Sequence, residues 1–499
     1  MENKILFWFG TDFTHFCMSY FLQKENNSNF YSIVDITNKP KKFFDEQNIV
    51  KFKKTWHLHE NIQQKNEKID LEFLKHFEEK YNLNLWKLAI NERQFYRFFE
   101  FHKFSREEIL LILQQEAKFF DSVLDEIKPD FFITKEPSRH SLQLLYEMCK
   151  NLGIKVMVLS STKIGRRIMI SESPTKFNDL DLHNTIEEKT FKELQETLRS
   201  SGTRKSIENY IQEHGKSKTE TIKAGLNYLF KNNNENIETH YNYFGRTKFS
   251  VLIFMLNSIF KKKSAEKYME KELSKELPND TSFVYFPLGV DMERNLLISA
   301  PFYTNQVEII RHIAKALPIH IRLIVKETPA QKSREWREIS EYKEIQEIPN
   351  VILMHPDVSS EEIIKKSSLV MTISGSSGLE AAFFEKPSII FSDTVYSFLP
   401  SVTRIDNIEK LPDEIKNSLS KKVSSYDISS FMSILEKNSF EFDWLEINSK
   451  FKNKFYYNGG LVDVDISIER VVEFLNENKI ELEKLAIEHN KIIKDHRVE

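Results

Sequence analysis

The chain has 499 residues, a length that suits two or three domains. Its 71 Lys and Arg residues nearly balance 74 Asp and Glu, a formal net charge of -3, so the composition shows no basic excess of the kind that binds nucleic acid. With 40% hydrophobic residues and no long apolar run, the sequence fits neither a disordered chain nor a membrane-spanning one.

The first third of the chain alternates strand and helix patterns. Because helices separate the strands, those strands are expected to pair in parallel. This pattern predicts a Rossmann-like domain over residues 1–180. The expected strands are 5–9, 31–34, 131–134 and 156–159, and the expected helices are 13–22, 106–127 and 138–152.

Residues 181–280 show consecutive helical patterns and no convincing strand, which predicts a helical insert or linker. Within it, residues 249–260 are strongly apolar and are followed by Lys261, Lys262 and Lys263, a composition typical of a helix at a membrane surface. A buried helix with lysines at its negative C-terminal end explains the same pattern and is the interpretation we favour. Peripheral contact with the inner face of a membrane is the alternative.

The alternation returns more regularly after residue 281 and predicts a doubly wound parallel sheet over residues 281–440, with ligands at the carboxyl ends of its strands. The last residues, from about Asp465, read as one long helix, and we expect the segment 441–499 to pack back across both domains. The fold class is therefore α/β, with two Rossmann-like domains, a helical insert and a long C-terminal helix. The expected strands are 283–286, 319–325, 351–354, 369–373 and 388–391, and the expected helices are 306–317, 333–348, 361–366 and 377–384.

The cysteine count and the N-terminus bear on location. Cys17 and Cys149 are too few for a disulfide framework or a four-thiolate zinc site, which suits a reducing compartment. The apolar run 5–9 ends at Gly10 and is too short for a signal peptide. We expect a cytoplasmic protein.

A serine- and glycine-rich turn directly follows one expected strand and opens a helix. Small residues let a ligand approach the backbone, and the free N–H groups of a helix start favour a phosphate. A tight turn with a serine N-cap is the alternative. The residues concerned are Ser374, Gly375, Ser376, Ser377 and Gly378, with Glu380 placed to accept ribose hydrogen bonds or to offset the helix dipole.

Two other strand ends carry polar groups that we expect in the same crevice. Lys326, Glu327 and Thr328 follow the expected strand 319–325, where the lysine would stabilise phosphate charge and Glu327 or Thr328 would contact the leaving nucleotide. An ordinary solvated loop is the alternative. Glu293 lies in the segment after the strand 283–286.

The motifs of the C-terminal half resemble the capsular polysaccharide biosynthesis family, which includes glycosyltransferases of GT-B architecture, among them enzymes resembling transferases of Kdo from CMP-Kdo. The resemblance implies that Lys326, Ser374 to Ser377 and Glu380 hold the donor nucleotide and its phosphate. Thr328 stands where the family commonly has histidine, which removes an imidazolium charge. The run Asp291-Met292-Glu293 replaces a frequent Gln-Pro-Glu. The motifs are Val284 to Leu288, Glu293-Arg294, Tyr303, Gln306, Ala316-Leu317-Pro318, Val325-Lys326-Glu327-x-Pro329, Pro349-Asn350-Val351, Ser359-Ser360, Ser374 to Ala381 and Lys386-Pro387.

In a GT-B enzyme the acceptor would lie against the N-terminal domain, where its hydroxyl must lose a proton. Asp12 and His15 follow the first expected strand, and Glu136 and His140 follow a later one. Asp12 and Glu136 are the preferred bases, although each also fits a helix start. Cations that would bind an anionic acceptor or a donor carboxylate, or simply lie on the surface, are Arg139, Lys163, Arg166 and Arg167.

Several acidic and histidine pairs imitate metal sites without the expected context. Asp179 and Asp181 with His183, and Asp463 with Asp465, do not follow a nucleotide-binding strand, and His57 and His59 have no third ligand nearby, so we expect solvated loop histidines and no metal. No protein cofactor is expected, since the nucleotide-sugar is itself the substrate.

The combined interpretation is an inverting, metal-independent glycosyltransferase of surface polysaccharide biosynthesis. Its expected partners are a nucleotide-sugar donor, CMP-linked by the resemblance, and a glycan or lipid-linked glycan acceptor, with no nucleic acid. A nucleotide-sugar epimerase or hydrolase of the same fold, and a non-catalytic glycan-assembly module, are the alternatives.

Overall fold

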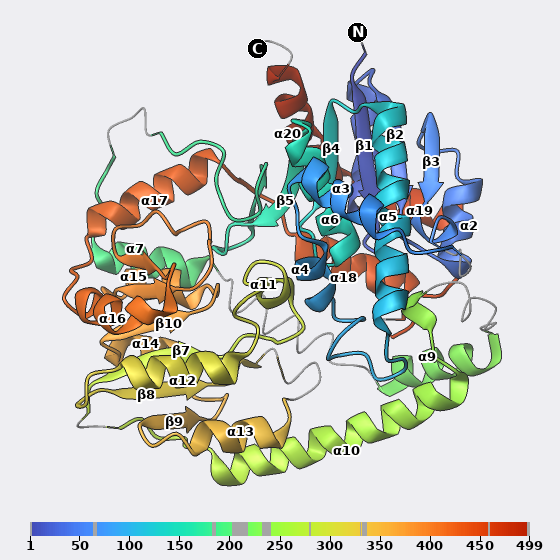
Figure 1. Cartoon of the computed structure of the whole chain (residues 1–499). Coiled ribbons are helices and arrows are strands. Elements are labelled where there is room, and N and C mark those ends of the chain that lie inside the picture. Colours follow the sequence, from blue (N-terminus) through green and yellow to red (C-terminus); the bar gives the residue numbers. More distant parts are fainter. Residues whose placement is uncertain are drawn as a thin grey trace.

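The computed structural model shows two α/β units, each built around its own sheet (Figure 1). Within the described part of the chain, every helix is too short or too polar to cross a membrane. The residues described are 2–62, 67–181, 186–201, 218–231, 241–278, 281–329, 331, 337–457 and 460–496.

The N-terminal unit has a seven-stranded sheet in the order β13-β6-β5-β4-β1-β2-β3. The strands from β3 to β5 run parallel, in the order 3-2-1-4-5 of a Rossmann half, and β6 runs antiparallel to both β5 and β13. The bounds are β1 (Lys4–Phe9), β2 (Asn29–Val34), β3 (Lys54–His57), β4 (Phe131–Lys135), β5 (Lys155–Ser161), β6 (Arg167–Ser171) and β13 (Phe440–Glu441).

The near-continuous apolar run of β1 is explained by burial on both faces of this sheet. Phe7 and Phe9 belong to one hydrophobic core, while Leu6 and Trp8 belong to the other. Helices cover both faces, as alternating βα units require. They are α1 (Thr14–Glu25), α2 (Asn38–Glu46), the 3-10 helix η1 (Leu58–Glu60), α3 (Leu71–Tyr81), α4 (Leu85–Ile90), α5 (Arg106–Ile127) and α6 (His140–Asn151).

The C-terminal unit has six strands, all parallel, in the order β12-β11-β10-β7-β8-β9. If β7 is numbered as strand 1 and the sheet is read from β9 to β12, the order is 3-2-1-4-5-6, which is the doubly wound order. The switch point, where the strand order reverses, lies between β7 and β10. The strands are β7 (Phe283–Pro287), β8 (Arg322–Lys326), β9 (Val351–Met354), β10 (Leu369–Thr372), β11 (Ser388–Ile390) and β12 (Val402–Arg404). The helices are α11 (Arg294–Leu297), α12 (Gln306–Ala316), α13 (Ile339–Gln346), α14 (Ser360–Lys366), α15 (Ser377–Phe383), the 3-10 helix η4 (Ile408–Lys410), α16 (Leu411–Leu419) and α17 (Ser425–Lys437).

The predicted helical insert is helical where it is described, but its helices are distributed between the two units. Its helices are α7 (Phe191–Ser200), α9 (Lys218–Lys231), the 3-10 helix η2 (Tyr241–Tyr243) and α10 (Lys248–Glu272). Leu194 of α7 is buried in a core formed mostly by the C-terminal unit and joined by Met169 of β6, whereas Tyr241 of η2 is buried in a core of the N-terminal unit. Helix α10 runs along the outer edge of the molecule from α9 to α13 (Figure 1).

The C-terminal segment differs from the single helix expected from about Asp465. It forms α18 (Trp444–Phe455), α19 (Ile468–Glu477) and α20 (Lys479–Asp495), and α19 ends at Asn478, whose side-chain amide donates to the Phe474 carbonyl at 2.9 Å. These helices belong to the core built on β1 and β2, with α20 against α1. The described part of this segment therefore completes the core of the N-terminal unit, and its packing across both domains stays a prediction.

Candidate functional site

A cavity of about 470 Å³ lies between the two units, and we call it the interdomain cavity. The C-terminal unit contributes the segments that follow β7, β8 and β10, which include the switch point of its sheet. The N-terminal unit contributes the segments that follow β4 and β5. The position agrees with the expectation that ligands of doubly wound sheets bind at the carboxyl ends of the strands.

Most of the residues predicted from the sequence to bind the donor line this cavity. The exception is Gly378, where an added Cβ would lie 2.7 Å from the hydroxyl oxygen of Tyr396. Gly378 therefore allows close packing of α15 against Tyr396. The predicted residues that line the cavity are Glu293, Lys326, Thr328, Ser374, Gly375, Ser376, Ser377 and Glu380.

The serine and glycine turn is held by its own hydrogen bonds. The Gly375 N–H donates to Thr372 Oγ1 at 3.1 Å, and a Cβ at this position would lie 2.7 Å from that oxygen. Tyr396 donates its hydroxyl hydrogen to the Gly375 carbonyl. Ser376 donates from Oγ to Glu380 Oε1 at 3.0 Å, and the buried Ser377 hydroxyl oxygen has no hydrogen-bond partner among the described residues.

Cationic side chains of both units reach this cavity. Lys326 is buried, and its Nζ donates to Ser360 Oγ at 2.7 Å. Lys163 comes from the segment after β5 and donates from Nζ to the Ser374 carbonyl at 2.9 Å, so it ties the two units together beside the turn. Burial lowers the pKa of Lys163, with Arg294 adding to this effect and Glu136 opposing it. Such groups suit a phosphorylated ligand.

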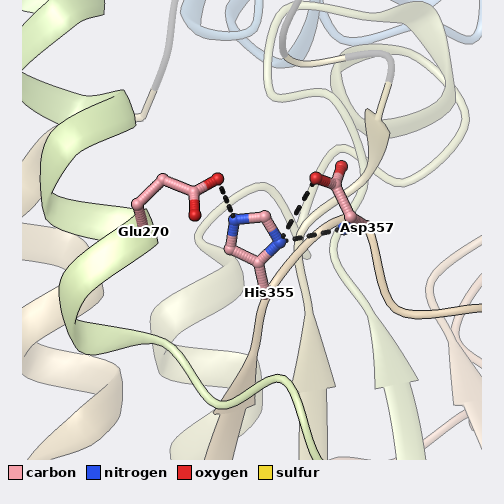
Figure 2. Close-up of side chains that lie close together, drawn as sticks. All are labelled: Glu270, His355 and Asp357. Carbon is pink, nitrogen blue, oxygen red and sulfur yellow. Dashed lines mark hydrogen bonds and ion pairs between the residues drawn. The ribbon is translucent and has the colours of Figure 1, made fainter.

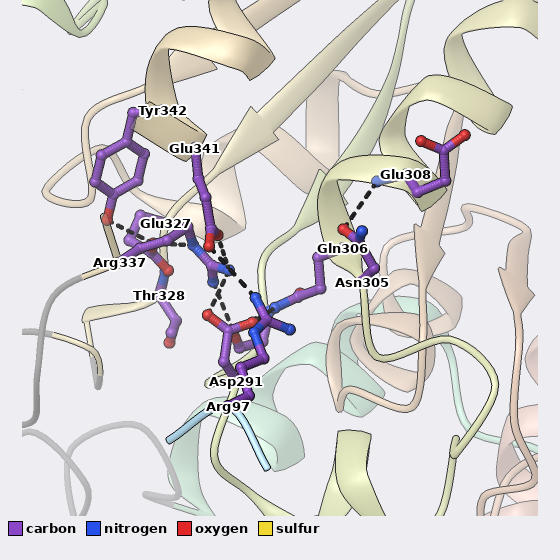
Figure 3. A network of polar contacts seen from close by, with 11 residues as sticks. Arg97, Asp291, Asn305, Gln306, Glu308, Glu327, Thr328, Arg337, Glu341 and Tyr342 are labelled. Atoms are coloured by element: carbon purple, nitrogen blue, oxygen red, sulfur yellow. Dashed lines mark hydrogen bonds and ion pairs between the residues drawn. The ribbon is translucent and has the colours of Figure 1, made fainter. Parts of the chain in front are cut away.

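A buried ionic network anchors the wall of the cavity (Figure 3). Arg337 donates to Glu327 from Nε at 3.1 Å and lies 2.5 Å from Asp291, and Tyr342 donates to Glu327 at 2.8 Å. Glu327 lines the interdomain cavity but is fully buried, and its carboxylate accepts hydrogen bonds from Arg337 and Tyr342, so it holds the loop after β8 in place. No sequence motif marks Arg337.

The same network fixes the segment after β7. Gln306 accepts from the Gly289 N–H at 2.7 Å and donates to Asp291 at 2.7 Å, while Arg337 donates to the Gly289 carbonyl at 3.0 Å. At the outer side, Glu341 pairs with Arg97 of the N-terminal unit at 3.3 Å (Figure 3). The loops after β7 and β8 are thus fastened to each other and to the other unit.

A second cavity of about 400 Å³, the bridging cavity, adjoins the first. Glu136 and Arg294 line both cavities, and Asp12 lines only the bridging one. The Glu136 Oε2 atom lies 3.3 Å from a terminal nitrogen of Arg294, and Oε1 accepts from the Ser161 N–H at 3.3 Å. Of the proposed bases, Glu136 is the one that the structure brings next to the predicted donor residues.

The other two proposed bases are placed less favourably. Asp12 accepts hydrogen bonds from the Thr14 N–H at 3.0 Å and from Trp444 Nε1 at 3.1 Å. Burial opposes ionisation of Asp12, but the charge of Lys135 and the Thr14 hydrogen bonds outweigh it and lower the pKa. His15 is buried, its ring lies 6.1 Å from that of His489, and burial lowers its pKa to about 3. His15 lines neither the interdomain nor the bridging cavity.

His140, named from the same strand end as Glu136, is a buried ion-pair partner. Its Nδ1 lies 2.9 Å from Glu92 and its Nε2 lies 2.9 Å from Glu116. Burial alone would lower the pKa of His140, but Glu116 and Glu92 raise it to about 10. Arg166 pairs with Asp443 at 3.1 Å and Arg167 bonds to Ser439, and neither lines the interdomain cavity.

The histidines and acids that resembled metal sites lie elsewhere. His59 is buried and its Nε2 lies 2.6 Å from Asp35, while His57 lies 2.9 Å from Asp45, so neither is a solvated loop residue. Asp179 pairs with Lys437, and Asp463 accepts from the Lys39 N–H at 3.1 Å. His183 lies outside the described residues.

Among the described residues, one group has the spacing of metal ligands: Glu270, His355 and Asp357 (Figure 2). The Asp357 N–H donates to His355 Nδ1 at 3.2 Å, which places the imidazole hydrogen on Nε2, 3.1 Å from Glu270. Both ring nitrogens are thus engaged within the protein. The group does not line the interdomain cavity.

The chain is similar to several solved structures at low identity, with TM-scores below 0.5. The UDP-GlcNAc 2-epimerase of Methanocaldococcus jannaschii has 14% identity and a TM-score of 0.25, covering 88% of this chain and 100% of that chain. KpsC of Thermosulfurimonas dismutans, a beta Kdo 2,7 transferase, has 12% identity and a TM-score of 0.29. The match covers 70% of this chain and 87% of KpsC. The N-terminal domain of the trehalose-6-phosphate phosphatase of Candida albicans has 9% identity and a TM-score of 0.30, covering 89% and 95%.

The sequence itself gives a family match. No curated protein matches the chain. The family described as "Capsule polysaccharide biosynthesis protein" matches residues 205–433, a range that contains all six strands of the C-terminal sheet and the cavity loops between them. The resemblance expected from the motifs is therefore confirmed over residues 205–433, the part of the chain that matches the capsular polysaccharide biosynthesis family.

Proposed function

We propose that this protein is a glycosyltransferase that moves a sugar from a nucleotide-sugar to an acceptor hydroxyl in surface polysaccharide biosynthesis. The observation that carries the proposal is the interdomain cavity, where Glu136 of one unit faces Lys326, the 374–377 turn and Glu380 of the other. The C-terminal unit would hold the nucleotide and its phosphates, with Lys326 and Lys163 offsetting their charge. The family match supports the biosynthetic role.

The chemistry assigned to the cavity is an inverting transfer by direct displacement. The acceptor hydroxyl would approach from the bridging cavity and lose its proton to Glu136 as the bond between the sugar and the phosphate breaks. Lys326 and the backbone of the turn would stabilise the phosphate charge that develops on the leaving nucleotide. Inversion, independence from metal and a CMP-linked donor are parts of this proposal.

Nucleotide binding tests the pocket. Lys326→Ala and Glu380→Ala should each weaken nucleotide affinity, the lysine variant by about 10- to 100-fold, because a charge-assisted hydrogen bond contributes about 1.5–3 kcal/mol. Lys365→Ala and Glu362→Ala, exposed residues of α14, are matched controls that should bind as the wild type does. Unchanged affinity in both cavity variants would remove the assigned pocket.

Donor and reaction type are separated by two further measurements. Thermal shifts with CMP-, UDP- and GDP-sugars identify the nucleotide, because a ligand that binds the native form raises the melting temperature. Donor turnover with and without a glycan acceptor then distinguishes transfer, which needs the acceptor, from epimerisation or hydrolysis, which does not. Binding of none of the nucleotides would favour a non-catalytic assembly module.

A further inference from the structure

We propose that a basic cavity of the N-terminal unit binds an anionic group, a phosphate or a carboxylate, of the acceptor. This assignment rests on the transferase function proposed above and names the class of its acceptor. The cavity has a volume of about 440 Å³ and lies among the segments after β1, β2 and β4 and the segment that leads into α10. Its cations are Arg93, Lys135, Arg139 and Arg246.

The cations outnumber the acids of this cavity, and the acids are already engaged. Asp35 and Asp463 are the carboxylates that line it. Asp35 lies 2.6 Å from His59 Nε2, and Asp463 accepts from the Lys39 N–H at 3.1 Å. Burial raises the pKa of Asp463 above its ordinary value.

Two of the cations lack a direct partner among the described residues. The side chains of Arg139 and Lys135 make no hydrogen bond or ion pair there, although both sense the charge of Asp35 at longer range. An unpaired cation in a cavity is costly unless an anion joins it. The arrangement is therefore suited to a ligand that carries negative charge.

Arg246 adds a partly buried cation from the segment that leads into α10. Its guanidinium carbon lies 5.0 Å from the ring centres of Phe99 and Phe101, and its buried Nε makes no hydrogen bond within the part of the chain that the structure describes. Burial and the charge of Arg139 lower the pKa of Arg246, although Tyr243 opposes this. An anion between Arg139 and Arg246 would relieve this repulsion and satisfy planar donors that match phosphate and carboxylate oxygens.

The three cavities share residues and so form one path. Lys135 and Ser138 line both the basic and the bridging cavity, and Glu136 and Arg294 line both the bridging and the interdomain cavity. Lys135 and Glu136 are consecutive residues at the end of β4. An acceptor held by its anionic group in the basic cavity would thus reach the proposed base through the bridging cavity.

Calorimetric titration with inorganic pyrophosphate and, separately, with glucuronate tests this site. The paired variant Arg139→Gln/Arg246→Gln should bind its preferred anion at least about 10-fold more weakly than the wild type, because charge-assisted hydrogen bonds are lost. A paired control in exposed arginines, Arg166→Gln/Arg199→Gln, should bind normally. Tighter binding of pyrophosphate indicates a phosphate-linked acceptor, and tighter binding of glucuronate indicates an acidic sugar.

The proposal would be overturned if Arg139→Gln/Arg246→Gln bound pyrophosphate and glucuronate as tightly as the wild type does. A loss of anion binding in Lys326→Ala alone would overturn it as well. Lys135→Gln provides a second variant if the paired one does not fold, as judged by circular dichroism. Nucleotide titration of the same proteins keeps the two proposals apart: Arg139→Gln/Arg246→Gln should bind nucleotide normally. A wild type that binds pyrophosphate at the arginines and no nucleotide would remove the donor pocket while leaving the anion site in place.

The outer faces of α9 and α10 carry a separate site, and we infer that they lie on an anionic lipid bilayer. In the 25 residues of α10, the buried side chains are Ala265 and Met269 near its end, while its first half exposes large apolar groups. Phe249 and Phe260 are 73% and 71% exposed, and Phe230 of α9 is 80% exposed. Exposed apolar patches of this kind mark interaction surfaces.

The charge next to this apolar face selects a lipid surface over a second copy of the chain. Lys261, Lys262 and Lys263 directly follow Phe260 and are exposed. A helix with large apolar side chains and adjacent lysines binds anionic headgroups while its apolar groups enter the acyl boundary. The structure thus corrects the expectation of a buried helix at residues 249–260. Arg246, which lines the basic cavity, lies two residues before α10, so this cavity adjoins the start of the exposed apolar helix.

Sedimentation with vesicles of phosphatidylglycerol, and of phosphatidylcholine alone, tests the bilayer contact. The wild type should bind the anionic vesicles, and Phe249→Ser/Leu256→Ser/Phe260→Ser should lose at least about 10-fold in binding through lost apolar burial. Phe302→Ser/Ile319→Ser is the matched control, since these residues are equally exposed on the C-terminal unit. Equal binding by the triple variant, or self-association that disappears in it while vesicles are not bound, would overturn the assignment.

Discussion

The guanidinium of Arg294 contacts two consecutive residues of the other unit: a terminal nitrogen lies 3.3 Å from Glu136 Oε2, and its Nε donates to the Pro137 carbonyl at 2.9 Å. Arg294 of the C-terminal unit therefore positions the Glu136 carboxylate, which we propose as the base. Because Arg294 is the N-terminal residue of α11, which follows β7, the alignment of the two sheets determines where this carboxylate lies.

Replacing Glu136, the proposed base, should slow sugar transfer without changing nucleotide affinity. Glu136→Gln keeps the shape and the Ser161 hydrogen bond but cannot accept the hydroxyl proton, so transfer should slow by about 100- to 10,000-fold while nucleotide affinity stays within about 3-fold. The measurement is kcat with saturating donor and acceptor, beside nucleotide titration. Glu172→Gln, an exposed residue of the same unit, is the control, and an unchanged kcat in Glu136→Gln would exclude this residue as the base.

Gly378 should prove to be a packing residue. Gly378→Ala places a Cβ 2.7 Å from the Tyr396 hydroxyl oxygen and 3.2 Å from Thr372 Cγ2, so we expect a loss of about 1–3 kcal/mol in the free energy of unfolding. Urea unfolding measures it. In the Tyr396→Phe background the same substitution should cost less, because the clashing oxygen is gone, and full additivity of the two changes would contradict this explanation.

The buried Arg337 should matter for stability more than its lack of any motif suggests. Arg337→Met leaves Asp291 and Glu327 without their cation in a buried setting, and we expect a loss of about 3–5 kcal/mol in the free energy of unfolding. The variant Arg311→Met removes an exposed, ion-paired arginine of α12 and should lose less than about 1 kcal/mol. Similar losses in the two variants, measured by urea unfolding, would show that the network does not act as described.

Stability should depend on pH through His140. Its folded pKa of about 10 lies above the ordinary value of 6.5, so its contribution to stability is complete below pH 6.5 and disappears as the pH rises to about 10. Glu92, with a pKa lowered to about 2 against burial by its contacts with His140, contributes above pH 4.5 and loses that contribution toward pH 2. Wild-type unfolding free energies should therefore fall between pH 7 and 10.

The matched variant for this prediction is His140→Gln, which cannot carry the proton. Its unfolding free energy should change less than that of the wild type between pH 7 and 10, as measured by urea unfolding at several pH values. A parallel pH dependence in the two proteins would assign the effect to other groups.

The regular alternation of elements could be predicted because each central strand is an apolar run of the length that both faces of a sheet bury. The strand β3 could not, since Lys54 begins it at an exposed edge and its remaining residues are only half-buried. Nor could the division of the C-terminal segment at Asn478, because the apolar spacing continues across the break.

The candidate site, too, could be predicted from the sequence only in part. The placement of Lys326 and the 374–377 turn beside one cavity could be predicted because strand ends gather at one edge of a parallel sheet. The roles of Glu327 and Gly378 depend on partners distant in the sequence, Arg337 and Tyr396, and local pattern gives no sign of them. The expected domain bounds 1–180 and 281–440 remain a proposal, although β13 shows that the N-terminal sheet also takes residues from beyond 439.

The return of the chain to its first unit has a consequence for synthesis. Phe451, Phe474 and Leu485 from α18, α19 and α20 share a core with β1 and β2, which leave the ribosome first. During translation, part of the apolar core of the N-terminal unit therefore stays exposed until α18, α19 and α20 have left the ribosome. The later-made C-terminal half can meanwhile close its own sheet, so the half that begins first finishes last.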